Sequence, residues 1–141
     1  MSESIVVGTD GSDTAKRAVA EAVRLAKALG AEVHVVSAYE PLRGVTVGGA
    51  PEVAPLPDAV VDSTLAQAAA VGRFADVPVS THAVRGDPAD ALVEIAAEID
   101  ASLIVVGNQG MHGAKRILGS VPNTVSHKAR CNVLIVATDT Q

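Results

Sequence analysis

Four small residues in the carboxyl-terminal third of the sequence have the types and spacing that suit phosphate binding. Gly107 and Gly110 follow an apolar run, and Gly119 and Ser120 come shortly afterwards. Glycine permits a positive φ and lets backbone N–H groups approach a phosphate with no Cβ in the way. Ser120 at a helix start would add a hydroxyl, unpaired amides and the positive end of the helix dipole. The alternative is that the glycines only turn the chain and that Ser120 only caps a helix.

A second candidate stretch lies near the amino terminus, where an apolar run ends in Gly8-Thr9-Asp10-Gly11-Ser12. The Asp10 carboxylate can accept hydrogen bonds from ribose hydroxyls, or hold a divalent cation that neutralises phosphates. An acid in an Asp-Gly-Ser turn can equally well cap the next helix, a role for which Ser12 and Asp13 compete. The ligand crevice of an open parallel sheet lies beyond the carboxyl ends of the strands, where the strand order reverses. If the first and fourth strands are neighbours, we expect the two candidate loops to face each other.

The remaining polar candidates have weaker patterns. The four histidines show no metal-ligand spacing, so we interpret them as structural or surface residues, with His112 near the ligand: His34, His82, His112 and His127. The basic pair Lys115 and Arg116 is expected either to approach phosphates or to lie on a solvated surface. The single cysteine, Cys131, cannot form an internal disulfide and is expected to be a small packed residue.

Composition narrows the function classes. The 141 residues, 48% of them apolar, predict one domain over residues 1–141 that builds a core without disulfides or metals. A net charge of -5 argues against nucleic acid and against anionic membranes as partners. Tyr39 and Phe74 are the only aromatic residues, so no platform exists for stacking unpaired bases. No signal-peptide pattern and no run long enough to span a membrane occur, so we expect a cytoplasmic protein.

Five short runs rich in β-branched residues alternate with longer helical stretches, which is typical of repeated βαβ units. We therefore predict a doubly wound α/β domain with a five-stranded parallel sheet and helices on both faces. The third run alternates apolar and polar residues and suits an edge strand. The predicted strands lie within residues 5–7, 33–36, 77–84, 103–106 and 133–136.

Helical periodicity places the remaining elements. Residues 14–29 predict a helix that Ser12 or Asp13 caps and Gly30 ends. Its apolar face is expected to contain Ala18, Ala22, Leu25 and Leu29. A second helix should cover about residues 58–71 and lead through Gly72 to the third strand, after an irregular flap at residues 40–57.

Two further helices follow in the carboxyl-terminal half. Asp87 and Pro88 predict the cap and first position of a helix that ends before Asp100. The last helix should run from about residue 120 to 129, with Pro122 in its first turn because proline fits only there. Arg85-Gly86-Asp87 is expected to be a turn and a cap, not a site.

Two segments together resemble the universal stress protein family: Ile5-Val-Val-Gly-Thr-Asp-Gly-Ser12 and Val105-Val-Gly-Asn-Gln-Gly-Met-His-Gly-Ala-Lys-Arg-Ile-Leu-Gly-Ser-Val121. The resemblance covers nearly the whole chain. The family's nucleotide-binding branch has a glycine, two residues, a glycine, nine residues, then glycine and Ser or Thr. Gly107, Gly110, Gly119 and Ser120 match these positions, but the spacer from Met111 to Leu118 has eight residues.

The resemblance implies the strand order 3-2-1-4-5 and an adenine nucleotide in the crevice: ATP, AMP or cyclic AMP, with or without Mg²⁺. Phosphates would lie on the amides of Gly110, Gly119 and Ser120, Asp10 would hold the ribose, and the backbone at Gly8 and Ala38 would flank the adenine. The implied cofactor-binding set is Gly8, Thr9, Asp10, Ala38, Gly107, Asn108, Gly110, Met111, His112, Gly119, Ser120 and Val121. Family members commonly dimerise through the last strand, here Val133 to Ala137, and an uncovered apolar edge strand also favours pairing.

The function that the sequence favours is an adenine-nucleotide-binding universal stress protein that acts as a stress-responsive binding or signalling module. No lysine-bearing P-loop occurs and no nucleophile with a base and an orienting acid can be assembled, so hydrolysis should be slow if it occurs. Two alternatives stay open. One is a slow Mg²⁺-dependent ATPase that uses Asp10. The other is an interaction protein that binds no nucleotide, which the eight-residue spacer supports.

Overall fold

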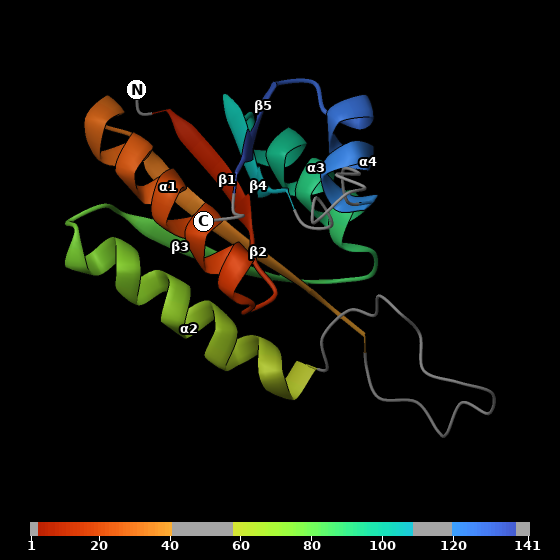
Figure 1. The fold of residues 1–141 in the computed structure, drawn as a ribbon, viewed down its shortest axis with the longest axis horizontal. Coiled ribbons are helices and arrows are strands. Elements are labelled where there is room, and N and C mark those ends of the chain that lie inside the picture. The colour runs from red at the N-terminus through yellow and green to blue at the C-terminus, as the bar shows by residue number, and fades with distance from the viewer. Residues whose placement is uncertain (1–2, 41–57, 109–119, 138–141) are drawn as a thin grey trace.

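The structure, a computed structural model, describes residues 3–40, 58–108 and 120–137. Strands and helices alternate along these residues, as the predicted βαβ units require (Figure 1). Their order is β1 (Ser4–Gly8), α1 (Asp13–Leu29), β2 (Glu32–Tyr39), α2 (Asp58–Phe74), β3 (Val79–Arg85), α3 (Pro88–Ile99), β4 (Leu103–Gly107), α4 (Ser120–Lys128) and β5 (Asn132–Val136).

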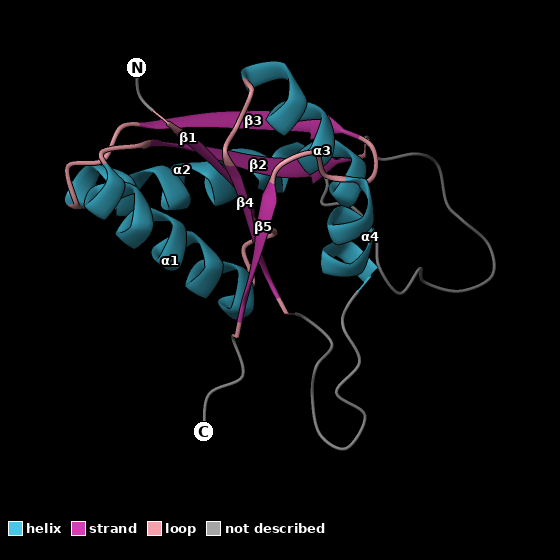
Figure 2. Ribbon diagram, turned by 90° about the horizontal axis from the view of Figure 1, so that it is seen from above, coloured by secondary structure: helices cyan, strands magenta, loops and turns pink. Residues whose placement is uncertain are grey.

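The strands form one parallel five-stranded sheet in the order β3-β2-β1-β4-β5, which confirms the predicted fold class. Helices α1 and α2 cover one face and α3 and α4 cover the other, so that the sheet separates the two helix pairs (Figure 2). β1 is the central strand, and Val6 pairs with His34 of β2 on one side and with Ile104 of β4 on the other. The direction of the strand order reverses between β1 and β4.

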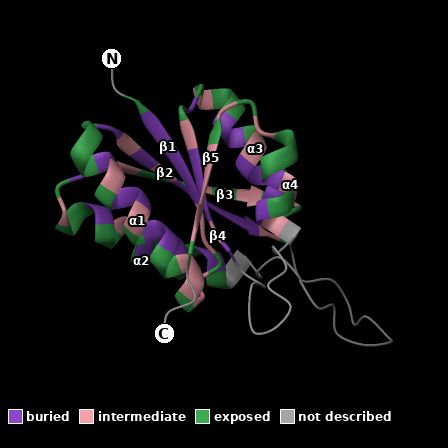
Figure 3. Ribbon diagram, turned by 45° about the horizontal axis from the view of Figure 1, so that its top comes forward, coloured by how far each residue is buried: buried purple, intermediate pink, exposed green. Residues whose placement is uncertain are grey.

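The core has two layers because the central strands are apolar on both faces. Successive strand residues point to opposite faces, so Ile5 and Val7 belong to the apolar layer of α1 and α2 while Val6 belongs to that of α3. The central strand β1 is buried over most of its length (Figure 3). Ile5, Val6 and Val7 have no solvent exposure. A continuous apolar run is what a strand buried on both faces needs, and this is why the run had no alternation.

The α1 helix differs from its predicted apolar face in one respect. Ala18 and Ala22 are buried as expected, but Leu29 is 57% exposed. Val19, Val23 and Ala26 complete the buried face instead. Leu29 is the last residue of the helix, and Gly30, at φ +68, turns the chain back toward β2 before Leu29 reaches the sheet.

The α2 helix is longer than predicted, and Gly72 lies inside its last turn instead of linking it to the next strand. A Cβ at Gly72 would overlap the Val79 side chain of β3. Glycine is therefore needed here for close approach of the helix to the sheet, which outweighs its low helix propensity. The β3 strand that follows is an edge strand of the sheet, as its alternating pattern predicted. The proposed flap, residues 41–57, lies outside the described residues.

Helices α3 and α4 begin where the sequence predicts. The Asp87 side chain accepts a hydrogen bond from the Asp90 amide, and Pro88 occupies the first helical turn. Asp100 ends α3 in the left-handed conformation, at φ 56. Pro122 lies in the first turn of α4 and is buried. Gly86 makes the preceding turn at φ +121, so Arg85-Gly86-Asp87 is a turn and a cap.

Candidate functional site

The two candidate loops leave the sheet side by side, because β1 and β4 are adjacent parallel strands. The first residue of each loop makes one more backbone hydrogen bond to the neighbouring strand. The Thr9 amide donates to the Val36 carbonyl at 3.0 Å, and the Asn108 amide donates to the Val136 carbonyl at 3.1 Å. The strands therefore fix the start of both loops at the carboxyl edge where the strand order reverses, which is where open α/β sheets bind ligands.

The β1–α1 loop is built from its own side chains. The Asp10 carboxylate accepts a hydrogen bond from the Ser12 amide at 2.9 Å through Oδ1, and Thr9 Oγ1 accepts one from the Gly11 amide at 3.1 Å. Ser12, not Asp13, is the helix cap, since its Oγ accepts from the Ala15 amide at 3.2 Å. Asp10 therefore does not cap the helix, which was one of its two interpretations, but forms the turn that leads to the Ser12 cap. Among the described residues, its Oδ2 has no hydrogen-bond partner and Asp10 is exposed, so that oxygen is available to a ligand.

The conformation and small size of Gly11 let this loop lie close to α2. Its φ is +83, a left-handed conformation that glycine adopts without a Cβ penalty. A Cβ here would stand 3.1 Å from Thr64 Oγ1, on the buried side of α2. Thr64 had no pattern that marked it in the sequence, and only the packing of α2 beside the loop reveals it.

Gly8 is close to α3, and this gives it a packing role beside any ligand role. A Cβ on Gly8 would stand 3.0 Å from Leu92 Cδ1 and 3.1 Å from Leu92 Cδ2, so the Leu92 side chain fills that space. Leu92 is 2% exposed. Ala38, near the end of β2, is also buried and packs in the same layer under α3. The backbone of both residues lies near the carboxyl edge of the sheet, as the sequence predicted.

The second loop is described only at its two ends. Gly107 ends β4, and Asn108 is buried with an exposed fraction of 7%. At the far end, Ser120 begins α4 and Val121 packs half-buried against the α3 layer. Gly110, Met111, His112 and Gly119, together with Lys115 and Arg116, lie outside the described residues. The described ends place the start of the loop at the switch point and its return at a helix amino terminus.

Helix α4 is positioned by α3. Val125 of α4 has no solvent exposure and joins the apolar layer that contains Leu92 and Ile95. Lys128 Nζ also lies 3.0 Å from the Asp90 carboxylate of α3. Both partners of this ion pair are more than half exposed, so it contributes at most about 1 kcal/mol and apolar packing sets the position of α4.

Cys131, His34 and His82 do not lie in the candidate loops. Cys131 packs half-buried against the α3 and α4 layer, and burial raises the pKa of its thiol above the ordinary value, which lowers its reactivity at neutral pH. In residues 3–40, 58–108 and 120–137, no three His, Cys, Asp or Glu side chains are grouped to hold a metal ion. His34 and His82, which seemed unrelated in the sequence, are hydrogen-bonded to each other away from the candidate loops.

Comparison with known proteins decides the family. The family model described as the universal stress protein family matches residues 1–137. This chain belongs to that family. It is 39% identical to a universal stress protein of Mycobacterium tuberculosis over 150 aligned residues, which cover 96% of this chain and 97% of the relative.

Solved structures of the family have the same fold. One is a crystal structure of a universal stress protein in complex with cAMP, at a TM-score of 0.78 and 37% identity, with 98% of each chain covered. Another is the universal stress protein of Archaeoglobus fulgidus in complex with dAMP, at a TM-score of 0.72 and 26% identity, covering 94% of this chain and 96% of that one. No helix in the described part of this chain is both long and apolar enough to cross a membrane.

Proposed function

We propose that this chain is a domain, spanning residues 1–141, that binds an adenine nucleotide in the crevice between the β1–α1 and β4–α4 loops. The observation that carries the proposal is the similar fold of a family member in complex with cAMP, to which this chain is 37% identical over 98% of its length. The dAMP complex of a second family member supports the same ligand class. We extend the proposal to AMP, cyclic AMP and ATP, with or without Mg²⁺, as ligands of a stress-responsive binding module.

The described geometry supports different ligand groups for the two loops. Asp10 presents a carboxylate oxygen that accepts hydrogen bonds, which suits ribose hydroxyls and disfavours direct contact with a phosphate. The β4–α4 loop ends at Ser120 on the amino terminus of α4, where backbone N–H groups and the helix dipole favour an anion. In this proposal the ribose lies on the first loop and the phosphate on the second, with the adenine between Gly8, Ala38 and the β4 end.

The direct test is to identify what freshly purified protein carries and what it binds. The supernatant released by heating is analysed by mass spectrometry and nucleotide chromatography, and ATP, ADP, AMP and cyclic AMP are then titrated by calorimetry with and without Mg²⁺. An adenine nucleotide recovered in stoichiometric amount, or saturable binding of one of these four, is the expected result. A protein that carries none and binds none would contradict the proposal and favour an interaction protein without nucleotide.

Asp10→Ala should weaken adenine nucleotide binding by about 10- to 100-fold, because a hydrogen bond to a charged group is worth about 1.5–3 kcal/mol. Calorimetric titration of the tightest-binding nucleotide measures the change. Asp13→Ala is the matched control, since it removes the same charge from an exposed residue three positions along the chain and should bind like the wild type. Asp10→Asn keeps an oxygen for the Ser12 amide and isolates the effect of charge. If Asp10→Ala binds nucleotide with wild-type affinity, Asp10 does not contact the ligand and only forms the turn.

We also propose that the chain forms a homodimer through β5, over Val133 to Ala137. β5 is an edge strand, and Val133, Leu134, Ile135 and Val136 are all only half-buried within one chain. Unpaired edge backbone with apolar side chains is favourable for pairing. Sedimentation equilibrium should give twice the mass of the chain. Hydrogen exchange of the β5 amides should slow as protein concentration rises, and a monomer at all concentrations would exclude this dimer.

A further inference from the structure

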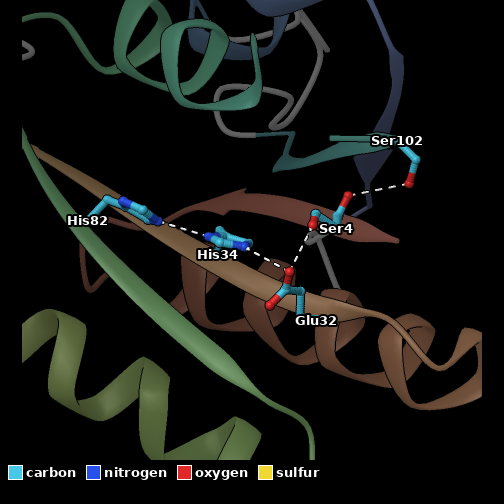
Figure 4. A network of polar contacts seen from close by, with 5 residues as sticks. All are labelled: Ser4, Glu32, His34, His82 and Ser102. Atoms are coloured by element: carbon cyan, nitrogen blue, oxygen red, sulfur yellow. Dashed lines mark hydrogen bonds and ion pairs between the residues drawn. The ribbon is translucent and has the colours of Figure 1, made fainter. Parts of the chain in front are cut away.

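A line of polar contacts crosses the sheet on the face that α3 and α4 cover, apart from the candidate crevice (Figure 4). Ser102 Oγ donates to the Ser4 carbonyl at 3.3 Å, and Ser4 Oγ donates to the Glu32 carboxylate at 3.1 Å. Glu32 Oε2 lies 3.6 Å from His34 Nε2. His34 Nδ1 is 2.9 Å from His82 Nε2, so the line ends on the edge strand β3.

The two imidazole rings meet edge to edge. Their centroids are 5.1 Å apart and their planes differ by 26°. The centroid separation is about the sum of the 2.9 Å N···N distance and the two distances from a ring centroid to its own nitrogen. The two nitrogens therefore lie close to the line between the centroids. Each nitrogen therefore points at the other, which is the geometry of a near-linear N–H···N hydrogen bond.

That geometry suits a proton and not a metal ion. A metal bound by two imidazoles stands about 2.0–2.1 Å from each nitrogen, and in a tetrahedral site both lone pairs converge on a point off the N···N line. Lone pairs that point at each other do not converge in this way. Within the described ranges no third ligand joins the two rings, and Glu32 faces the opposite ring nitrogen of His34.

The carboxylate of Glu32 favours a hydrogen on the His34 ring nitrogen that faces it. His34 Nε2 is buried and has no hydrogen-bond partner among the residues that the structure describes, with Glu32 Oε2 at 3.6 Å. A proton on Nε2 is stabilised by that negative charge, whereas a lone pair there would be repelled by it. His34 Nδ1 is then the acceptor, and His82 Nε2 donates to it.

We propose that His34 and His82 form a one-proton clasp, which fastens β3 to β2 while the pair carries no more than one added proton and opens when both imidazoles are protonated. Either ring can take the first added proton, because one N–H···N bond remains between a charged imidazole and a neutral one. A second added proton removes the remaining acceptor and places two cations in contact. The carboxylates that act on the pair are Glu32 of β2 and Glu98 of α3.

The sign of the pH effect follows from the surroundings of His82. Burial lowers the pKa of His82 below its ordinary value of 6.5, and the charge of His34 lowers it further, while Glu98 opposes both. A histidine whose pKa is lower in the folded state contributes stability that is complete above pH 6.5 and is lost as the pH falls below that value. Acid should therefore loosen β3, the edge strand, before it affects the central strands.

The first experiment follows the imidazole carbon and proton signals of the wild-type protein by NMR, from about pH 8 to about pH 5, where ordinary histidines change charge. The His82 signals should titrate in two linked steps, the second of them below the ordinary value of 6.5. In His34→Gln, the remaining imidazole of the pair should titrate in one step. A single step of His82 at its ordinary value in the wild type would overturn the proposal, and this result needs no variant.

The second experiment compares folding stability at both ends of that pH range by urea unfolding, for wild type, His82→Gln and the control His127→Gln. Each unit by which the folded-state pKa is lowered costs a tenfold factor in the folded-to-unfolded ratio below the titration range. Wild type and His127→Gln should lose this ratio in acid, and His82→Gln should lose less. Native-state hydrogen exchange should show the acid effect first in β3. An equal acid loss in all three proteins would contradict the clasp.

Discussion

Gly119→Val should abolish adenine nucleotide binding without unfolding the protein. Gly119 directly precedes the amino terminus of α4 and matches the family's phosphate-binding glycine, although it lies outside the described residues. In the proposed site, a branched side chain would stand where the phosphate approaches the backbone amides, and it would also restrict the conformations that glycine allows. Calorimetric titration should show no saturable binding at nucleotide concentrations that saturate the wild type.

The control for this variant is Ser126→Val, which introduces the same side chain on an exposed position of α4. It should bind nucleotide like the wild type. Circular dichroism and the urea midpoint of Gly119→Val report whether the fold is kept. If Gly119→Val folds and binds nucleotide with unchanged affinity, the phosphate does not lie on this glycine, and the shortened spacer has moved the site.

Leu92→Ala should give the largest loss of stability among the variants considered, about 2–5 kcal/mol, as is usual for truncating a buried leucine. Leu92 is 2% exposed and fills the space that a side chain on Gly8 would take. Urea unfolding measures the change. Val93→Ala, on the half-buried neighbour, should cost clearly less. A loss for Leu92→Ala no larger than that of Val93→Ala would mean that α3 closes over the gap.

The contact between Leu92 and Gly8 can be tested directly by a double-mutant cycle. Gly8→Ala alone is expected to destabilise the protein, because the new Cβ stands 3.0 Å from Leu92 Cδ1 and the leucine must move. In the Leu92→Ala background the same methyl group enters vacated space and should be tolerated or stabilising. Additive effects in the cycle would show that the two residues do not compete for one volume.

Sequence patterns predicted the elements well where the signal is local. The Asp87 cap, Pro88 in the first turn and the end of α3 before Asp100 follow from local sequence, and the structure has all three. The apolar runs of the central strands likewise reflect burial on both faces. Leu29 was predicted on the buried face of α1 but is exposed. The turn at Gly30 ends the helix there, and helical periodicity alone does not predict how much of the helix packs on the sheet.

The candidate site could be predicted in its location but not in its supports. Two loops that follow neighbouring strands must share an edge of the sheet, so the common edge of the β1–α1 and β4–α4 loops could be predicted once β1 and β4 were taken as neighbours. The close approach of Gly8 to Leu92 joins β1 to α3, and that of Gly11 to Thr64 joins the β1–α1 loop to α2. The His34 and His82 pair depends on the β2–β3 register, in which His82 pairs with Val36. No local pattern determines these distances.

The position of β1 in the middle of the sheet has a consequence for the time course of folding. Its partner on one side, β2, follows after a single helix, whereas contacts such as that of Ser102 with Ser4, beside the β4 partner, span 98 residues. Contacts distant in sequence close late because the loop entropy must be lost first. The first three strands with α1 and α2 can assemble during synthesis, but the crevice exists only after β4 has emerged from the ribosome. A nucleotide bound in the proposed crevice would therefore stabilise the finished chain and would not guide the folding of its first half.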